Sequence, residues 1–472
     1  MTLSPLIVLS DGDIAAIHEA TLDILGTCGV LIENARVLDL LDAGGLPVDR
    51  ERHIVRFPRQ RVADALGTVP NHIEVFDRDG QPAFTLGDGT PRVAAGHNAV
   101  FWVDSETGET RASTVEDVAL CARLCEQLDH IDMIGISVMP QDVASPRATL
   151  LHAVRATIAN SRKPLFFSTD QPSVNRACIA MARAACPGRT YAIAQLSPTS
   201  PLYWESLVMD ALADTVEAGV PLAILPEPNA GVSAPITLAG LLTVNNAECL
   251  SGIVIAQVLR SGAPVLYANS WTTTDMRTGA ALVGSAETSV CRIAGAQLAQ
   301  HYGIPCHTTA PNSDNHAHDE QNAWEKTLSQ FCALAAGNDL IVNCGMFATG
   351  MTFSHEQLVM DEEITALCRR IARGIEVTPE TIAAGVVKEI GPRGGSYLMA
   401  EHTLANLRSA EHHLPRIAVR GPWASWHDQG APDTTALARE AVRSLAQNPG
   451  APVDAARQRA LDEIVSRFGS GE

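Results

Sequence analysis

A short hydrophobic run, a polar or glycine- and proline-containing break, and then a helical pattern recur seven times between residues 134 and 344. Successive runs start 27 to 43 residues apart, which is the length of one strand, one loop and one helix. Each run is continuously hydrophobic rather than alternating, which is typical of a strand buried on both faces. The seven runs are IGISV (from Ile134), PLFFS (from Pro164), YAIAQL (from Tyr191), PLAIL (from Pro221), PVLYA (from Pro264), IPCHT (from Ile304) and LIVNC (from Leu340).

Seven such units in one chain predict an α/β fold of the TIM, or (β/α)8, barrel type. The glycine-rich segment GPRGGSYL after the seventh unit is either a loop or the eighth strand, and PRVAAGHNAVFWVDSETGETR before the first unit is predicted to be a β-hairpin. Barrel chemistry takes place on the loops that follow the strands. The site is therefore expected on the polar, lysine-poor loops MPQD, STD, SPTSP, PEPNAG, NSWTTTD, APNSDN and GMFATG.

Residues 1–90 follow a different pattern and are predicted to form an N-terminal α/β cap packed against the barrel. DGDIAAIHEATLDILGTCGV reads as an amphipathic helix ended by Gly29, and ENARVLDLLDAGG reads as a second helix. Two strands and another helix follow. Residues 91–472 are then the barrel domain, with a polar helical tail from about Asp433.

Composition narrows the classes of protein to which the chain can belong. Hydrophobic residues make up 46% of the 472 positions and charged residues 18%, which argues against disorder. The net charge of -19 disfavours nucleic acid and anionic membranes as partners, and no stretch approaches eighteen uninterrupted apolar residues. The amino terminus does not resemble a signal peptide, and the eleven cysteines have no paired framework, so we expect a cytoplasmic protein.

The densest group of potential ligand residues follows the sixth run, in the segment HTTAPNSDNHAHDEQ. One interpretation is a zinc site, in which His316 and His318 form a His-x-His pair that is joined by Cys344 from the next strand end. Another is a polar loop that organises turns, with Asp319 capping the following helix. A third is an active-site loop that needs no metal.

The loop PEPNAG holds Glu227 between two prolines, and this restriction suits a carboxylate that binds a cation. The alternative is a structural loop that starts the next helix. Aromatic residues are only 4% of the chain, so those at predicted strand ends are informative. Aromatic faces and a carboxylate are what a quaternary ammonium group requires, because it donates no ordinary hydrogen bond. The substrate-binding candidates are Glu227, Asn229, Trp271, Phe347 and Tyr203, although a single loop tryptophan is more often a packing residue.

Four long phrases of the sequence resemble the trimethylamine methyltransferase superfamily, and the likeness covers nearly the whole chain. They are LPEPNAGVSAPITLAGLLTVNNAECLSGIVIAQVLRSGAPVLYA, GSAETSVCRIAGAQLAQHYGIP, FSHEQLVMDEEITALCRRIARGI and GGSYLMAEHTL. The resemblance implies a TIM barrel that moves a methyl group from an amine to the cobalt of a corrinoid, cob(I)alamin, held by a separate corrinoid-binding protein.

The archaeal trimethylamine enzymes of this superfamily carry pyrrolysine in a segment similar to SDNHAHDEQNAWEK. No such residue stands in this sequence, where the corresponding window is Asn315 to His318. The resemblance therefore points to the non-pyrrolysine branch, which acts on glycine betaine, proline betaine, carnitine or γ-butyrobetaine. It also suggests that the loop faces the scissile methyl group, with the catalytic candidates Asp314, Asn315, His316 and His318 and with no metal.

The chemistry of a quaternary amine agrees with this interpretation. The departing group is a neutral tertiary amine that needs no activating acid, so the protein has mainly to position the methyl group in line with cobalt. We predict a cytoplasmic homo-oligomer that demethylates a small quaternary amine, most simply glycine betaine. The alternatives are another betaine or a sulfonium, a silent homologue that binds the amine without turnover, and a zinc-dependent methyltransferase or lyase.

Overall fold

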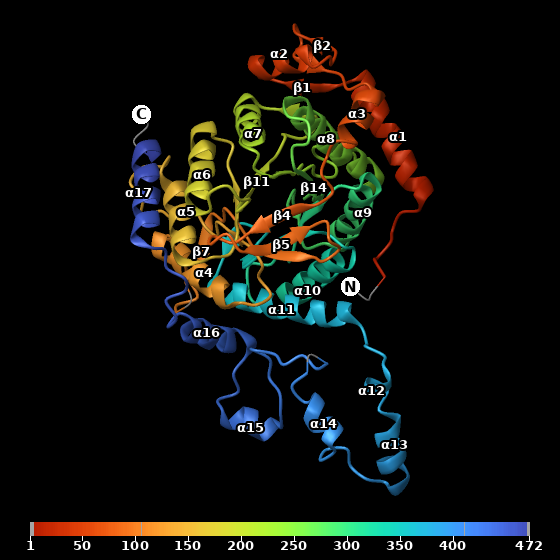
Figure 1. Cartoon of the computed structure of the whole chain (residues 1–472), viewed down its shortest axis with the longest axis vertical. Helices are drawn as coiled ribbons and strands as arrows, with labels where there is room; N and C mark the ends of the chain where they lie inside the picture. The colour runs from red at the N-terminus through yellow and green to blue at the C-terminus, as the bar shows by residue number, and fades with distance from the viewer. Residues whose placement is uncertain (1–3, 105, 410, 470–472) are drawn as a thin grey trace.

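The computed structural model describes residues 4–104, 106–409 and 411–469. Within these residues eight parallel strands form a barrel, which Figure 1 shows surrounded by a ring of helices. An isolated parallel bridge between Ala94 and Met133 brings the first strand beside the second and closes the circle. In order around the barrel, the strands are β6 (Arg92–Ala95), β9 (Ile134–Gly135), β10 (Leu165–Ser168), β11 (Ala192–Leu196), β13 (Leu222–Ile224), β14 (Val265–Asn269), β17 (Cys306–Thr309) and β18 (Leu340–Cys344). The predicted barrel is confirmed.

The remaining barrel strand comes before the seven predicted strands, so the prediction of an eighth strand at GPRGGSYL is wrong and the predicted hairpin segment begins with a barrel strand. β6 lies in the segment predicted to form a hairpin, and it pairs in parallel with β18, Arg92 opposite Leu340. GPRGGSYL forms a short 3-10 helix, η1 (Gly391–Arg393), and a loop. The sequence of β6 is RVAA, and two of its four residues are alanines. Alanine fits a crowded barrel but gives little hydrophobic signal in the sequence. The hairpin itself is formed further on, by β7 (Phe101–Val103) and β8 (Thr110–Arg111).

A helix follows each barrel strand and covers the outside of the barrel. These helices are α4 (Val115–Gln127), α5 (Thr149–Asn160), α6 (Pro172–Ala185), α7 (Ser206–Ala218), α8 (Leu238–Leu259), α9 (Ala286–Tyr302), α10 (Glu320–Ala335) and α11 (His355–Arg373). Four of them begin at a side-chain cap that accepts a backbone N–H bond from the first turn, as expected for Ser, Thr and Asp at this position. The four capping residues are Thr114, Ser285, Asp319 and Ser354.

α8 is long and apolar enough, by length and composition, to cross a membrane. In the described part of the chain no other helix meets this criterion, and 72% of its apolar window is buried inside the protein. It packs between α7 and α9 and carries α1 and α3 on its outer side. These contacts are those of a core helix.

The amino-terminal end of the barrel is closed by a hairpin of β4 (Ile73–Phe76) and β5 (Pro82–Leu86), which lies across the centre of Figure 1. Its buried side chains join one apolar cluster with residues that point inward from the barrel strands. The hairpin contributes Ile73, Val75, Phe84 and Leu86, and the strands contribute Phe166, Ile193, Leu266 and Val342 among others. With this end plugged, the carboxyl ends of the strands are the end at which a ligand can enter.

The first 70 residues form an α/β layer on one flank of the barrel, whereas the rest of the predicted 1–90 cap forms the hairpin that closes the barrel. Its elements are α1 (Asp11–Thr27), β1 (Val30–Ile32), α2 (Ala35–Ala43), β2 (Val48–Asp49), β3 (Ile54–Val55) and α3 (Arg59–Leu66). β1 pairs in parallel with β12 (Tyr203–Trp204), a short strand that follows β11. Asn246 of α8 donates a hydrogen bond of 2.9 Å to the Thr21 hydroxyl of α1, so the layer is fixed to the barrel by polar as well as apolar contacts.

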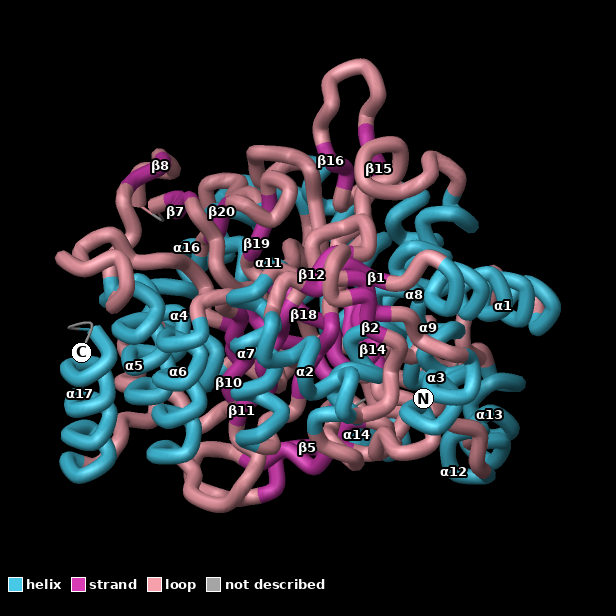
Figure 2. Tube along the Cα trace, turned by 90° about the horizontal axis from the view of Figure 1, so that it is seen from above, coloured by secondary structure: helices cyan, strands magenta, loops and turns pink. Residues whose placement is uncertain are grey.

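Two further parts of the chain complete the molecule. At the open end of the barrel, which faces up in Figure 2, lie β7, β8, β15 (Thr273–Thr274), β16 (Ala281–Leu282), β19 (Met346–Phe347) and β20 (Thr352–Phe353). After α11 the chain leaves the barrel through α12 (Pro379–Ile382), α13 (Ala384–Ile390), α14 (Glu401–Asn406) and α15 (Trp423–Asp428). It returns as α16 (Thr434–Leu445), which packs on α11, and α17 (Ala455–Gly469), which packs on α5 and α6.

Candidate active site

A cavity of about 330 Å³ lies at the carboxyl ends of the barrel strands. Its volume suits a small molecule, and its walls combine a few apolar residues with many neutral polar groups. The lining residues are His97, Gln195, Leu225, Glu227, Ser270, Thr272, Ala281, Val283, Thr309, Asn312, Asn343, Met346, Thr349 and Gly350. They come from six of the eight barrel strands or the loops that follow them, which is where the chemistry of this fold is located.

Glu227, on the loop after β13, is the one acidic side chain among these lining residues. Its side chain is exposed to the solvent inside the cavity, and the surrounding protein encloses that cavity. This enclosure raises the pKa of the carboxyl above its usual value, and a hydrogen bond from Ser270 opposes that rise. A carboxylate held in this way is stabilised when a cation enters the cavity.

The floor of the cavity is a chain of hydrogen bonds through Gln195. His307 Nδ1 lies 3.1 Å from the carbonyl oxygen of Leu340, which can only accept, so Nδ1 carries the proton. Burial lowers the pKa of His307 to about 3, which keeps the ring neutral and makes Nε2 an acceptor. Gln195 Oε1 is placed 3.2 Å from this Nε2, but two acceptors cannot bond each other, so the hydrogen bond requires the amide turned with its NH2 group toward the ring.

The side-chain amide of Gln195 also bonds His97. Because its NH2 group faces His307, its oxygen accepts the bond from His97. Nδ1 of His97 is buried and has no partner among the described residues, so the bond to Gln195 is made by Nε2–H. Burial lowers the pKa of His97 to about 4, and Phe166 packs against both imidazoles, at 5.1 and 5.4 Å between ring centres. The floor is therefore neutral and fixed in one tautomeric arrangement.

One wall of the cavity is a ladder of hydroxyl and amide groups. Ser270 and Thr309 share a hydrogen bond of 3.2 Å, the Asn312 amide donates to the Thr309 carbonyl at 3.1 Å, and Asn343 donates to Asn312 Oδ1 at 2.9 Å. Behind this wall the guanidinium of Arg292 is fully buried and donates to the carbonyl oxygen of Thr309 at 2.6 Å. It forms no ion pair with a carboxylate of the described residues, and burial lowers its pKa to about 10. This side of the cavity thus has positive electrostatic character.

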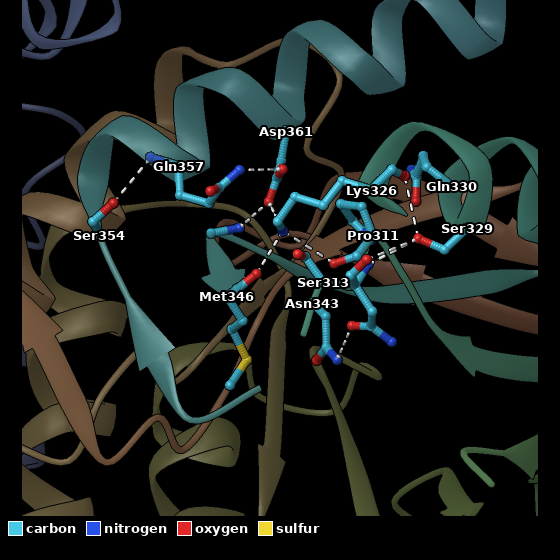
Figure 3. A network of polar contacts seen from close by, with 12 residues as sticks. Pro311, Ser313, Lys326, Ser329, Gln330, Asn343, Met346, Ser354, Gln357 and Asp361 are labelled. Carbon is cyan, nitrogen blue, oxygen red and sulfur yellow. Dashed lines mark hydrogen bonds and ion pairs between the residues drawn. The ribbon is translucent and has the colours of Figure 1, made fainter. Parts of the chain in front are cut away.

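The loops that carry the wall are held by a buried ion pair between Lys326 of α10 and Asp361 of α11, shown in Figure 3. The two charged atoms are 2.8 Å apart, and both side chains are completely buried. Lys326 also donates to the carbonyl oxygens of Pro311 and Met346, and Asp361 accepts from the Gly345 N–H at 2.7 Å. The pair therefore joins the loop after β17 to the loop after β18.

Backbone strain occurs at the end of β18 and in the loop that follows it. Asn343, Ala348 and Thr349 have φ values of 140°, 51° and 57°. Positive φ is uncommon for residues other than glycine and most costly for a β-branched residue such as threonine. Because the strained segment lines the cavity, the strain supports the assignment of the cavity as the functional site.

The four predicted catalytic residues lie beside the cavity and do not line it. Asp314 accepts bonds from the backbone N–H groups of Val283 and Gly284, at 2.8 and 3.0 Å, and from the Thr349 hydroxyl at 3.3 Å. Asn315 and Asp319 bond each other near the start of α10. Asp314 therefore acts on the cavity through the residues that it holds, since Val283 and Thr349 line it.

The two histidines of this loop differ in burial. His316 is exposed, whereas His318 is half-buried against the ring of Phe347, 5.0 Å between centres, and lies 3.4 Å from the Ser354 hydroxyl. Burial lowers the pKa of His318 to about 4. Across the described residues no three histidine, cysteine or acidic side chains gather in a way that could hold a metal ion.

The predicted aromatic residues also occupy positions outside the cavity lining. Trp271 is buried at 1% exposure, and a Cβ added at Gly295 of α9 would lie 2.8 Å from its ring, so Trp271 packs into the helix layer. Phe347 is buried against His318. Tyr203 donates to Glu33 of the N-terminal cap, and this bond raises its pKa to about 12.

Asn229 is likewise occupied, since its side chain accepts a bond from the Thr274 hydroxyl at 2.5 Å and shapes the loop behind Glu227. The geometry thus supports a ligand contact for Glu227 among the five predicted substrate-binding residues. The lining residues that the sequence did not single out are His97, Gln195, Asn312 and Asn343. Their positions at or just beyond strand ends were the available signal.

Comparison with known proteins identifies the family. A family model described as trimethylamine methyltransferase (MTTB) matches residues 1–469. The chain belongs to this family. A trimethylamine methyltransferase MttB of Desulfitobacterium hafniense is 32% identical over 445 residues, covering 93% of this chain and 89% of that protein. A glycine betaine methyltransferase of the same species is 27% identical over 427 residues, covering 89% of this chain and 88% of that protein.

Among solved structures, the monomethylamine methyltransferase MtmB of Methanosarcina barkeri covers 96% of this chain and 97% of its own, at 15% identity and a TM-score of 0.49. The family match establishes that the chain is an enzyme of the methyltransferase class, and that the resemblance found in the sequence is correct.

Proposed function

We propose that this MttB-family enzyme moves a methyl group from a quaternary amine, in the first instance glycine betaine, to a corrinoid carried by a separate protein. The product on the amine side is the neutral tertiary amine, dimethylglycine. The window Asn315 to His318 contains ordinary residues, so the proposed reaction uses no pyrrolysine. Family membership supports the methyl transfer, and the cavity supports the class of substrate.

Glu227 is the observation that carries the proposal. It places one carboxylate in an otherwise neutral cavity, where the cost of its desolvation is recovered when a permanent cation binds. An ammonium group held there by charge needs no hydrogen bond. The thioether-bearing Met346 and the aliphatic Leu225 and Val283 supply apolar surface for methyl groups.

The opposite end of a betaine is a carboxylate, and the wall of hydroxyl and amide groups can receive it. Ser270, Thr309 and Asn312 stand there in front of the buried Arg292 guanidinium. Hydroxyl and amide donors stabilise a carboxylate, and a cation behind them adds to this effect. The two charged ends of the substrate therefore match the two sides of the cavity.

The cavity is sized for the amine and far too small to admit a corrin macrocycle as well. The corrinoid, when its carrier is docked, supplies a strongly nucleophilic cobalt at the mouth of the barrel. This chain's residues orient one methyl group toward that mouth and exclude competing groups, which is a task of positioning. The neutral floor of His97, Gln195 and His307 agrees with a reaction in which no proton is moved.

The direct test is to mix the enzyme with free or carrier-bound cob(I)alamin and glycine betaine, and to follow the cobalamin spectrum together with the appearance of dimethylglycine. Formation of both products supports the proposal. Proline betaine, carnitine, γ-butyrobetaine, dimethylsulfoniopropionate and trimethylamine are run in parallel. Absence of methyl transfer from all the betaines would overturn it.

A second test isolates the role of Glu227. Glycine betaine and 3,3-dimethylbutanoate have nearly the same shape, but only the first carries a positive charge. Calorimetry should show that the wild-type enzyme prefers the betaine and that Glu227→Gln loses this preference by a factor of about 10 or more, the value of one partly desolvated ion pair. Glu287→Gln, an exposed acid of α9 outside the cavity, is the matched control. Equal loss in both variants would contradict the assignment.

Trimethylamine is a second candidate, favoured by one observation. The described lining residues include no phenylalanine, tyrosine or tryptophan, so the aromatic surface that would select a quaternary cation is missing. Trimethylammonium could donate its single N–H to Glu227. Transfer from trimethylamine and none from the betaines would establish this candidate.

A further inference from the structure

The segment from residue 375 to residue 432, here called the arm, leaves the barrel and buries little of its own apolar surface. Figure 1 shows its helices α12 to α15 standing apart from the ring of barrel helices. None of these four helices contains a buried residue, and they are four to seven residues long. Helices this short are not stable by themselves, so their order requires a surface to pack against.

The arm carries an unusual concentration of exposed apolar side chains. It holds twelve of the large hydrophobic residues that are exposed in the described chain, including Leu398, Met399 and Leu404 of the α14 region at 72%, 79% and 59% exposure. The full set is Ile375, Val377, Ile382, Val387, Tyr397, Leu398, Met399, Leu404, Leu407, Leu414, Val419 and Trp423. Apolar side chains gathered in this number on one exposed segment mark an interaction surface.

One part of the arm, residues 411–417, is bonded to α11 and is here called the root. Arg370 of α11 donates to the carbonyl oxygen of Glu411 at 2.7 Å, and the Arg416 N–H donates to Glu363 at 2.7 Å. His413 bonds the same Glu363, and Ile417 is buried at 3% exposure. The anchored root leaves the apolar part of the arm projecting.

A complementary surface lies on the barrel beside this root. Trp324 and Leu328 of α10 and Leu367 and Ile371 of α11 are exposed at 61%, 44%, 40% and 56%, here called the strip. In each helix the two residues are four positions apart and so share one face, and α10 and α11 are packed together. One chain thus has both an apolar arm and an apolar strip.

Charge points to a second copy of the chain as the occupant. The arm has six acidic and five basic residues, whereas the whole chain has a net charge of -19. The arm is therefore nearly neutral and can approach another strongly acidic copy without the repulsion that other faces would meet. In Figure 2 the open end of the barrel faces up, and α12, α13 and α14 lie in the lower half. A protein bound to the arm would therefore lie away from the opening of the cavity.

We propose that the arm of each copy packs on the strip of a second copy, and that the exchange is reciprocal about a two-fold axis. This arrangement is self-complementary, because every copy offers one arm and one strip. It covers both apolar surfaces at once and gives the short arm helices the packing surface that they lack within one chain. The proposal is independent of the substrate.

Light scattering and sedimentation of the full-length enzyme over a range of concentrations test it. The wild-type chain should be at least a dimer, and Leu404→Glu in the arm or Leu328→Glu in the strip should each weaken association by roughly 30-fold or more, as for interface hot spots. Ile7→Glu, at a residue of the N-terminal segment that is 72% exposed, should have no effect. Circular dichroism checks that each variant is folded.

Mixing the two variants distinguishes reciprocal exchange from other interfaces. A mixed dimer contains one intact arm and strip pair, so an equimolar mixture of Leu404→Glu and Leu328→Glu should associate more tightly than either variant alone. A monomeric wild-type chain, association unaffected by either substitution, or a mixture no better than its components would each overturn the proposal. Association lost in Leu404→Glu and unchanged in Leu328→Glu would indicate instead that arms pack on arms, and a monomer would indicate that another protein covers the arm.

Discussion

Removal of the Lys326 ammonium should destabilise the enzyme in a manner that depends on pH. Lys326→Met keeps the length of the side chain but leaves Asp361 buried with bonds from Gly345 and Gln357 alone. It also deprives the carbonyl oxygens of Pro311 and Met346 of a donor. Breaking a buried pair by removing one partner costs about 3–5 kcal/mol, and we expect a loss of this size.

The pH dependence follows from the carboxyl that remains. Burial already raises the pKa of Asp361 in the folded enzyme, and loss of the neighbouring cation raises it further. A group whose pKa is higher in the folded state favours folding when protonated, and this contribution is lost as pH rises through the folded pKa. The cost of Lys326→Met should therefore increase with pH, by at most about 1.4 kcal/mol for each unit.

Urea unfolding followed by circular dichroism at pH 6 and pH 8 measures this. Lys388→Met, at an exposed lysine of α13, is the matched control and should change the free energy of unfolding by less than about 0.5 kcal/mol. The double variant Lys326→Met, Asp361→Leu should recover much of the loss, because no buried charge remains. A loss below about 1 kcal/mol, or one equal at both pH values, would refute the interpretation of the pair as a buried tie between the site loops.

Three further predictions concern other parts of the enzyme. The pKa of His307 is lowered to about 3, below the ordinary histidine value of 6.5, so stability should fall as pH decreases from 6.5 toward 3. His307→Gln should flatten this part of a plot of unfolding temperature against pH. Because the pKa of Glu227 is raised, glycine betaine affinity measured by calorimetry should fall as pH decreases through that pKa, and an affinity independent of pH, or equal to that of Glu227→Gln, would count against the cation site. Gly295→Ala should cost about 1–3 kcal/mol because its Cβ would lie 2.7 to 2.8 Å from Asn269 and Trp271, whereas Gly385→Ala, which meets nothing within 4 Å, should be neutral or slightly stabilising; equal effects in denaturant titrations would contradict the packing assigned to Trp271.

The barrel could be predicted because seven of its strands have large apolar residues on both faces, and this pattern depends on the strand alone. β6 escaped because its RVAA sequence uses alanine where the barrel is narrow, and the information that fixes it lies in its partner β18. The predicted hairpin does form, between β7 and β8, but it occupies only the second half of the segment in which it was predicted. A strand with weak hydrophobic character is recognisable only through the neighbour with which it pairs.

The site could be predicted at the level of loops but not of side chains. Glu227, which two prolines and its position after a strand mark, lines the cavity, whereas Trp271 occurs on an equally suitable loop and packs outward against Gly295. The catalytic role of Asp314 stays a prediction, and in the structure its carboxylate accepts bonds from the backbone N–H groups of Val283 and Gly284. Which way a loop side chain turns depends on partners distant in sequence, and these partners carry no local signal.

The structure suggests why so few charged groups are needed in this site and why those present are so firmly held. In the proposed reaction, methyl transfer from a quaternary amine leaves a neutral product, so an acid or base in the cavity would add nothing, and the histidines of the floor are kept neutral by burial. What the reaction does require is that one methyl group points to the mouth of the barrel with little freedom. Loops that line the cavity are fixed by the buried ion pair of Lys326 and Asp361 and by the Arg292 guanidinium, none of which lines the cavity itself. The strained Thr349 belongs to one of these loops and does line it. The buried charges beside the cavity therefore hold its walls, and Glu227 is the one acidic side chain among the lining residues.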